Sequence, residues 1–449
     1  MKLWSGLLIA VVSTFPVAGV RADARSDDAQ DDQSSDVPPA DTGDSTPPFK
    51  YTASFLARYE NRNHYDTIGA SRGRRLEGDA TAYRARVGAG LPAVSVGGNL
   101  LARTFLTVQA SGFLGELGNP IGDPPLGIYE GYARIDGSRH AFDFGRFAML
   151  YGDGLVIGNS NWRQNGRAFQ GVRARFLGPG GQYRVDVFAT QTAEGRPRSD
   201  AGGGDTYFYG VYAFLGPLLS STMEVDVYAL GLTWPETDEA GMDPGDPALV
   251  TRAHATTATL GVRTKDKRGA WDYRLEAGVQ MGTALAEPGL ESPAAVAYHG
   301  DLAVGYSVGR LRVGLEGLYA SGDDPATTDR YEGWNDLFAN RHKWLGRADI
   351  FLNRTNVYSG VLHLRYALGG PTRSRPSVLA MMEAHVLARP QPVNGATGYA
   401  GAELDVAVVK NLAKGLKLSG LVSLFRPEQA IFGSEQLVTY GEVQLRLDL

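Results

Sequence analysis

Arginine side chains at alternate positions are the main chemistry that this sequence offers. The chain has 44 lysine and arginine residues, of which only eight are lysine. Seven arginines fall on the polar positions of extended segments: Arg84, Arg86, Arg103, Arg134, Arg173, Arg175 and Arg184. Alternate residues of a strand share one face, and a planar guanidinium can bind a carboxylate through two hydrogen bonds. The spacing predicts a basic strip that guides anions or, equally, arginines that pair with carboxylates on neighbouring strands.

Other kinds of chemistry have little support in the sequence. There is no cysteine, which excludes a thiol nucleophile, a disulfide and a cysteine metal site. The seven histidines form no spaced cluster, and Asp323, Asp324 and Asp329 lack the twelve-residue pattern of a calcium loop. No Ser, His and Asp grouping that would suggest a hydrolase stands out by spacing. We therefore expect no catalytic residue, no metal and no cofactor.

The elements that would position the arginines are β-strands. From Tyr51 to Leu449 apolar and polar residues alternate, as in strands with one apolar face. Between a first strand starting at Tyr51 and a last strand ending at Leu449, sixteen further candidates lie at 80–91, 99–111, 126–136, 139–147, 168–177, 181–192, 205–215, 220–232, 252–264, 270–281, 296–308, 310–320, 354–368, 376–389, 399–410 and 414–425. Most are long enough for a tilted strand that crosses a bilayer, which needs about 9–11 residues.

The connections between these segments alternate between long and short. Long ones lie at 61–79, 112–125, 148–167, 193–204, 234–251, 282–295 and 321–353, whereas Gly137 and Ser138, Lys265 to Gly269, and Gly309 are examples of short ones. This alternation predicts an all-β fold: an 18-stranded antiparallel transmembrane β-barrel with long extracellular loops and short periplasmic turns. A soluble all-β protein such as a propeller is the alternative.

The N-terminal segment is expected to lie outside the barrel. An apolar stretch from Leu3 to Val12 and a small-residue site ending at Ala22 predict a signal peptide over 1–22, with an uncleaved anchor as the alternative. Residues 23–48 carry eight aspartates and predict an acidic disordered tail before a barrel at 49–449. The net charge of −5 resides in residues 1–49, so the rest is neutral and nucleic acid is not an expected partner.

Two blocks of the sequence resemble the alginate export family of outer-membrane porins. The first runs from Gly145 through Tyr151 to Phe169, and the second from Leu318 to Asn353. The resemblance implies an eighteen-stranded channel that passes anionic polysaccharide outward along an arginine-rich pathway. Matching positions imply pathway roles for Arg146, Asp153, Trp162, Arg163, Gln164, Arg167, Asp323, His342, Lys343 and Asp349. Both blocks adjoin long loops, which could either narrow the pore or contact the ligand.

The sequence thus predicts a channel in the outer membrane of a Gram-negative bacterium. Its expected substrate is alginate or a related anionic exopolysaccharide, moving by passive diffusion. Uptake of small anionic solutes and a surface barrel that transports nothing are the alternatives. Outer-membrane lipids and periplasmic components of a secretion complex are the expected partners.

Overall fold

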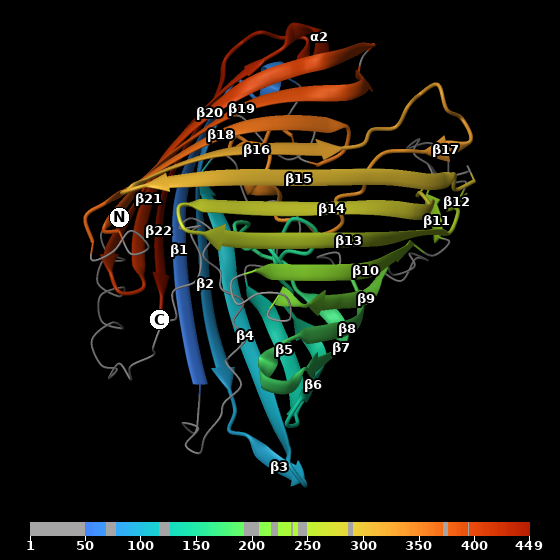
Figure 1. Cartoon of the computed structure of the whole chain (residues 1–449), viewed down its shortest axis with the longest axis vertical. Helices are drawn as coiled ribbons and strands as arrows, with labels where there is room; N and C mark the ends of the chain where they lie inside the picture. Colours follow the sequence, from blue (N-terminus) through green and yellow to red (C-terminus); the bar gives the residue numbers. More distant parts are fainter. Residues whose placement is uncertain are drawn as a thin grey trace.

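The computed structural model describes residues 50–68, 78–115, 126–192, 206–216, 223–234, 237–240, 249–285, 291–351, 353–370, 376–393 and 395–449. Within these residues, eighteen antiparallel strands form the wall of a barrel (Figure 1). They are β1 (Lys50–Asn63), β2 (Gly78–Gly90), β4 (Leu100–Gly115), β5 (Leu126–Asp136), β6 (His140–Phe147), β7 (Phe169–Leu177), β8 (Arg184–Gln191), β9 (Tyr207–Phe214), β10 (Glu224–Trp234), β13 (Ala255–Arg268), β14 (Trp271–Thr283), β15 (Ala294–Val308), β16 (Leu311–Ala320), β18 (Val357–Leu368), β19 (Val378–Val393), β20 (Ala396–Ala413), β21 (Leu416–Pro427) and β22 (Val438–Asp448). The expected fold class and strand number are confirmed.

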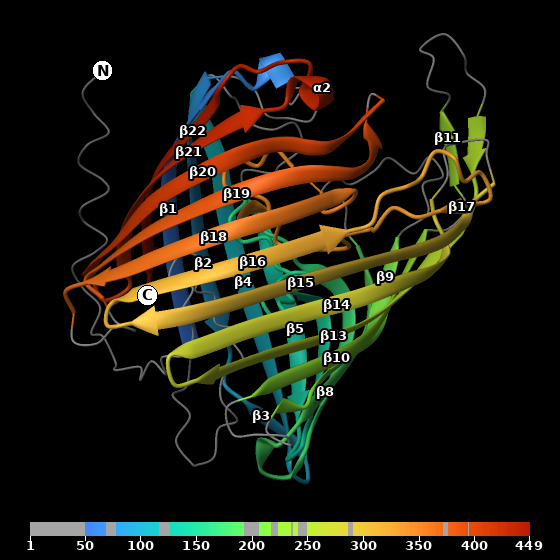
Figure 2. The same cartoon turned by 45° about the horizontal axis from the view of Figure 1, so that its top comes forward.

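The first and last strands close the barrel. β1 pairs with β22 over ten residue pairs, with Phe55 opposite Leu447 and Ala57 opposite Leu445. Ala53 and Leu449 exchange both backbone hydrogen bonds, at 3.2 and 2.8 Å. Figures 1 and 2 show blue β1 beside red β22 at this seam. Closure pairs both edges of the described eighteen-stranded wall, which is the condition for a sheet to cross a hydrocarbon layer.

The distribution of side chains is the reverse of that in a soluble protein. On β15, Val296 and Tyr298 are more than half exposed on the outer face, whereas His299 and Asp301 are buried toward the lumen. A sheet in water turns its apolar face inward. The apolar outer face therefore matches lipid, and the polar face lines the interior of the barrel.

The remaining elements are short. β3 (Val94–Gly97) pairs with β4, β11 (Thr237–Ala240) pairs with β12 (Leu249–Arg252), and β17 (Arg330–Tyr331) runs parallel to β15. The helical elements are η1 (Asp66–Ile68), η3 (Pro179–Gly181), η4 (Arg341–Lys343) and α2 (Gln429–Phe432). No helix in the described part of the chain has the length and apolar character to cross a membrane.

The structure corrects some strand ends. The expected turn from Lys265 to Gly269 is too long, because β13 continues to Arg268, which pairs with Trp271. Gly269 adopts a φ of 62°, a conformation that glycine reaches without steric cost and that suits a two-residue turn. The signal peptide at 1–22 and the acidic tail at 23–48 lie outside the described residues and stay predictions.

Candidate functional site

The connection between β6 and β7, residues 148–168, crosses the lumen, and we call it pore loop 1. At one side Arg263 of β13 donates a hydrogen bond of 2.8 Å to Asp153. At the other side Arg84 of β2 donates one of 2.6 Å to the carbonyl oxygen of Asn161. Because β2 and β13 lie on different sides of the barrel, this segment obstructs the interior (Figure 2).

Asp153 is the acidic anchor of pore loop 1. Its carboxylate accepts from Nε and Nη2 of Arg263 at 2.9 and 2.8 Å, and Nζ of Lys265 lies 3.7 Å away. Burial alone would raise the pKa of this carboxyl, but the positive charges of Arg263 and Lys265 outweigh burial and lower the pKa to about 2. The carboxylate is therefore ionised at any physiological pH, and the loop stays paired with β13.

A second inward segment, residues 321–356 between β16 and β18, meets the first, and we call it pore loop 2. The Gly158 N–H donates to the Phe338 carbonyl at 2.8 Å, and the Phe338 N–H donates to the Val156 carbonyl at 3.1 Å. The Asn340 side-chain oxygen accepts from the Ser160 N–H at 2.7 Å. These bonds join the two loops into one layer across the lumen.

Arg167 lies at the junction of the two loops. Its Nη1 donates to the carbonyl oxygens of Gly158, at 3.0 Å, and of Phe338, and its guanidinium lies 5.4 Å from the Phe338 ring. Burial, together with the positive charges of Arg163 and Arg341, lowers the pKa of Arg167. These acceptors are uncharged backbone oxygens, so Arg167 brings a positive charge into the layer.

Trp162 connects pore loop 1 to the seam of the barrel and to pore loop 2. Its ring stacks on His342 at 3.8 Å with an interplanar angle of 14°, and the guanidinium of Arg58 lies 4.0 Å from the ring centre. Its Nε1–H donates to Glu442 at 3.3 Å. His342 in turn lies 3.1 Å from Asp349. One indole thus contacts β1, β22 and pore loop 2.

Apolar packing holds pore loop 1 against the β6–β10 wall. The buried cluster combines loop residues with wall residues: Phe147, Met149, Tyr151, Val156, Ile157, Phe169, Phe188, Phe208, Tyr212, Tyr228, Leu230, Leu232 and Leu337. Tyr151 stacks on Tyr212 with ring centres 4.6 Å apart and donates to Asp186 at 2.9 Å. An inward loop with such a core is a fixed constriction rather than an open flap.

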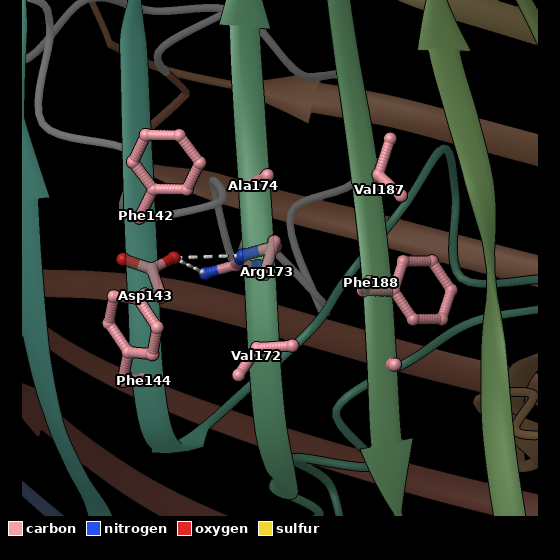
Figure 3. A pocket seen from close by; sticks show the side chains of 9 residues that line it. Phe142, Asp143, Phe144, Val172, Arg173, Ala174, Val187 and Phe188 are labelled. Carbon is pink, nitrogen blue, oxygen red and sulfur yellow. Dashed lines mark hydrogen bonds and ion pairs between the residues drawn. The ribbon is translucent and has the colours of Figure 1, made fainter.

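Three of the predicted wall arginines share one carboxylate. Asp143 of β6 is fully buried and lies 2.6 Å from Arg134, 2.7 Å from Arg173 and 3.1 Å from Arg175. Figure 3 shows the pairing of Asp143 with Arg173 on the next strand. Pairing across strands therefore accounts for part of the basic strip, but three cations around one anion leave an excess of positive charge.

Two further predicted arginines have carboxylate partners. Arg103 lies 3.3 Å from Asp136, and Arg184 lies 3.1 Å from Asp186. These pairs agree with the interpretation that wall arginines pair with neighbouring carboxylates.

Arg84 and Arg86 are bound differently. Arg84 donates to the carbonyl oxygens of Asn161 and Arg163, at 2.6 and 2.9 Å. Arg86 donates to the side-chain oxygen of Asn161 at 2.5 Å and lies 3.4 Å from the Tyr129 ring centre. Both guanidiniums are buried, and all these acceptors are neutral. The two charges therefore hold pore loop 1 in place and also make its surroundings positive.

The other predicted residues in and beside pore loop 1 have distinct surroundings. Arg146, near the end of β6 and just before the loop, donates to the Tyr129 carbonyl at 3.1 Å. Arg163 is exposed, and its carbonyl receives the bond from Arg84. Gln164 is buried, and in the described part of the chain its side-chain nitrogen has no hydrogen-bond partner. Of these three side chains, that of Arg163 is the most exposed.

The predicted residues of pore loop 2 do not gather at one point. Asp323 is exposed and accepts a hydrogen bond of 2.9 Å from the Glu332 N–H. Lys343 lies 4.5 Å from the Trp344 ring centre. His342 and Asp349 are buried beside Trp162, as described above. Asp323 thus belongs to the loop surface, whereas the other three belong to the layer that crosses the lumen.

The opposite wall is rich in carboxylates. Arg274 of β14 lies 2.5 Å from Asp301 and 3.3 Å from Glu316. His363 of β18 bridges Glu316 and Glu383, at 3.1 and 3.0 Å. In the eighteen-stranded ring these strands lie about half a turn from β4 to β6. The lumen therefore has a basic side and a more acidic side.

Two asparagines that organise the loops were not among the site residues predicted from the sequence. Asn161 accepts from Arg86, and the Asn340 N–H donates to the Gly154 carbonyl at 2.8 Å. A Cβ at Gly158 would lie 2.2 Å from the side-chain oxygen of Asn340, so a larger residue there would displace this oxygen from its hydrogen bond with the Ser160 N–H. Contacts between distant segments, of β2 with pore loop 1 and of pore loop 1 with pore loop 2, explain these residue types.

An apolar depression of about 270 Å³ on β6, β7 and β8 is separate from the pathway (Figure 3). Phe144, Val172 and Val187, which line it, are exposed on the outer face of the barrel. It therefore faces the hydrocarbon layer and is not a candidate solute site.

Comparison with known proteins agrees with this architecture. A family model described as alginate export matches residues 128–369, more than half of the chain. No curated protein matches the sequence. Among solved structures, OccAB1 of Acinetobacter baumannii has a TM-score of 0.64 at 12% identity, covering 89% of this chain and 96% of that one. OccK11 (OpdR) of Pseudomonas aeruginosa has a TM-score of 0.60 at 13% identity, covering 89% and 96%. OpdK of P. aeruginosa, in a structure with vanillate, has a TM-score of 0.60 at 12% identity, covering 89% and 98%.

Proposed function

Because this chain belongs to the alginate export family and folds as an outer-membrane channel, we propose that it conducts an anionic polysaccharide, alginate or a related exopolysaccharide, outward by passive diffusion. A channel of this kind needs no catalytic group, since the concentration gradient drives the movement. The protein's contribution is then the width of the lumen and the electrical potential along it.

The observation that carries the proposal is the positive charge around pore loop 1. Arg84, Arg86 and Arg167 place three guanidiniums against neutral acceptors, and Arg163 is exposed beside them. In a partly dehydrated lumen such charges act over longer distances than in water. A chain of carboxylated sugars would find there a favourable potential, and Arg163 supplies a side chain that can donate to carboxylates directly.

Uptake of small anionic solutes is the second candidate, and the layered loops favour it. Hydrogen bonds between Gly158 and Phe338 close the loops onto each other across the lumen. A narrow passage of this kind admits a small anion more readily than a hydrated polymer. Both functions use the same basic surface, so substrate size is what separates them.

Planar bilayer recordings test the proposal. In a salt gradient, we expect a reversal potential that indicates modest anion preference, and block of the current by oligouronates. A neutral oligosaccharide of equal length is the matched control and should block less. Block by monomeric uronate alone would favour small-solute uptake, and no conductance in a correctly folded barrel would contradict both functions.

The direction of transport needs a cellular test, because passive conduction is symmetric. Deletion of the gene should trap polymer in the periplasm if the channel exports it. Neighbouring genes for polymerase and glycosyltransferases would support export, whereas catabolic genes would support uptake.

A further inference from the structure

A second cluster of polar side chains lies on the lumen side of β19 and β20, away from pore loop 1. Glu383 and His385 alternate on β19, and Glu403 and Asp405 alternate on β20. The strand register puts Glu383 opposite Asp405 and His385 opposite Glu403. All four side chains are at most 6% exposed. The sheet therefore forms a compact patch of three carboxylates and one imidazole.

The distances within this patch suit the coordination of one ion. Glu383, His385 and Asp405 each offer a ligand atom, and these three atoms all lie within 4.8 Å of one another. Nε2 of His385 is 3.5 Å from a carboxylate oxygen of Asp405. An ion placed between them would contact imidazole nitrogen and carboxylate oxygen, a donor set typical of Zn²⁺ and related transition metals.

Several atoms of the patch are buried without a hydrogen bond. Among the described residues, neither ring nitrogen of His385 has a hydrogen-bond partner, and the same holds for Oδ1 of Asp405 and Oε2 of Glu403. Buried polar atoms in native proteins are usually paired, because desolvation without a partner is costly. Adjacent buried carboxylates also repel each other. A dication would satisfy the free lone pairs and remove this repulsion.

Pore loop 2 fixes the other side of the patch. The Arg347 N–H donates to Asp405 at 3.1 Å, and the Ala348 N–H donates to Glu403 at 2.7 Å. Glu383 is oriented by His363 at 3.0 Å and by Arg347 at 3.4 Å, and Arg365 lies 3.9 Å away. These outer contacts hold the carboxylates in defined positions, as the supporting residues of metal sites do.

We propose that Glu383, His385 and Asp405, with Glu403 beside them, form a binding site for a divalent transition-metal cation of the Zn²⁺ type. The ion bridges β19 and β20 beneath residues 347 and 348, so it stabilises the inward position of pore loop 2. Because the imidazole and carboxyl groups bind in their deprotonated forms, binding releases protons and weakens in acid. The sequence contains Glu-x-His on one strand and Glu-x-Asp on the next. These four residues can be recognised as one site only when the register of the two strands is known.

Metal retention by the full-length barrel tests this site. Protein stripped with EDTA in detergent is dialysed against Zn²⁺ and the bound metal is quantified, with heat-dependent gel migration as the check of folding. We expect about one Zn²⁺ per chain in the wild type, and at least about 10-fold weaker binding in H385A and D405N, since even supporting residues have effects of that size. H299A is the matched control, because His299 is also a buried lumen histidine but lies on β15.

Two results would overturn the proposal. One is equal Zn²⁺ retention by the wild type and a folded H385A/D405N double variant. The other is a loss of Zn²⁺ in H299A as large as in H385A. Competition by equimolar Ca²⁺ that displaces Zn²⁺ would overturn the assignment to a transition metal, because Ca²⁺ prefers oxygen ligands alone.

Discussion

Replacing Trp162 with alanine should loosen pore loop 1 and raise the conductance of the channel. The indole makes three contacts that alanine cannot make: the stack on His342 at 3.8 Å, the Arg58 guanidinium at 4.0 Å, and the hydrogen bond to Glu442 at 3.3 Å. An aromatic stack contributes ~0.5–1.5 kcal/mol, a cation–π contact ~0.5–2 kcal/mol and a hydrogen bond to a charged group ~1.5–3 kcal/mol.

These contributions share one side chain and do not add fully. We expect a total loss of about 2–4 kcal/mol, since neighbouring contacts are coupled. That loss changes the equilibrium between the attached and detached loop by about 30- to 800-fold. A detached state that is rare in the wild type would then be sampled often enough to appear as transitions to a higher conductance level.

Single-channel recording measures this effect directly. W162F keeps a ring for stacking but loses the Nε1–H, so it should give an intermediate frequency of transitions. W271A is the control, because Trp271 is 58% exposed on the outer face at the start of β14, far from the loop. If folded W162A shows the same conductance and the same noise as W271A, the loop is not held by Trp162 and the reasoning fails.

Three further predictions concern the lumen arginines of β2, the two faces of β22 and the pairing of Asp153. R84Q and R86Q should each shift the reversal potential toward cations and weaken block by oligouronates, because each removes a buried positive charge beside pore loop 1. Unchanged potentials in both would place the anion preference elsewhere. L445R should impair assembly, because arginine on the lipid face costs ~2–4 kcal/mol near the midplane. Q444R on the lumen face should fold, as judged by heat-dependent gel migration. Equal behaviour of the two variants would show that the faces of β22 are assigned wrongly. The pKa of Asp153 is lowered to about 2, so its pairing with Arg263 is complete above the ordinary aspartate pKa of about 4 and is lost only as the pH falls through about 2. Current noise should therefore stay constant between pH 5 and 8, whereas D153N should be noisy at pH 7. Noise that already rises at pH 5 would argue against this anchor.

Strand positions and faces were readable from the sequence because they depend on local chemistry. Alternation of apolar and polar residues is imposed by the two faces of a strand, and in a membrane each face has a different solvent. All eighteen expected strands are present, and residues such as Leu445 lie on the exposed outer face as their parity predicts. Where the ends were wrong, as at Lys265 to Gly269, the cause was a glycine turn tighter than polarity alone suggests.

The partners of the charged residues were only partly predictable. Alternation places Arg134, Arg173 and Arg175 on the polar face, but the sequence could not show that all three share the carboxylate of Asp143. That arrangement depends on the register of three strands. The choice between a basic strip and paired charges is therefore decided residue by residue: Arg134 is paired, whereas Arg84 donates to backbone oxygens.

The loops mark the limit of what sequence alone determines. The two blocks that resemble the family, around Trp162 and His342, can be recognised in the local sequence. The stacking of these two rings, 180 positions apart, could not be predicted from it. In the same way, Glu383 and Asp405 come together only through strand register. Local alternation determines the strands because successive residues of a strand face lipid and the lumen in turn. The constriction and the buried cluster depend on contacts between distant segments, and these exist only once the barrel has closed.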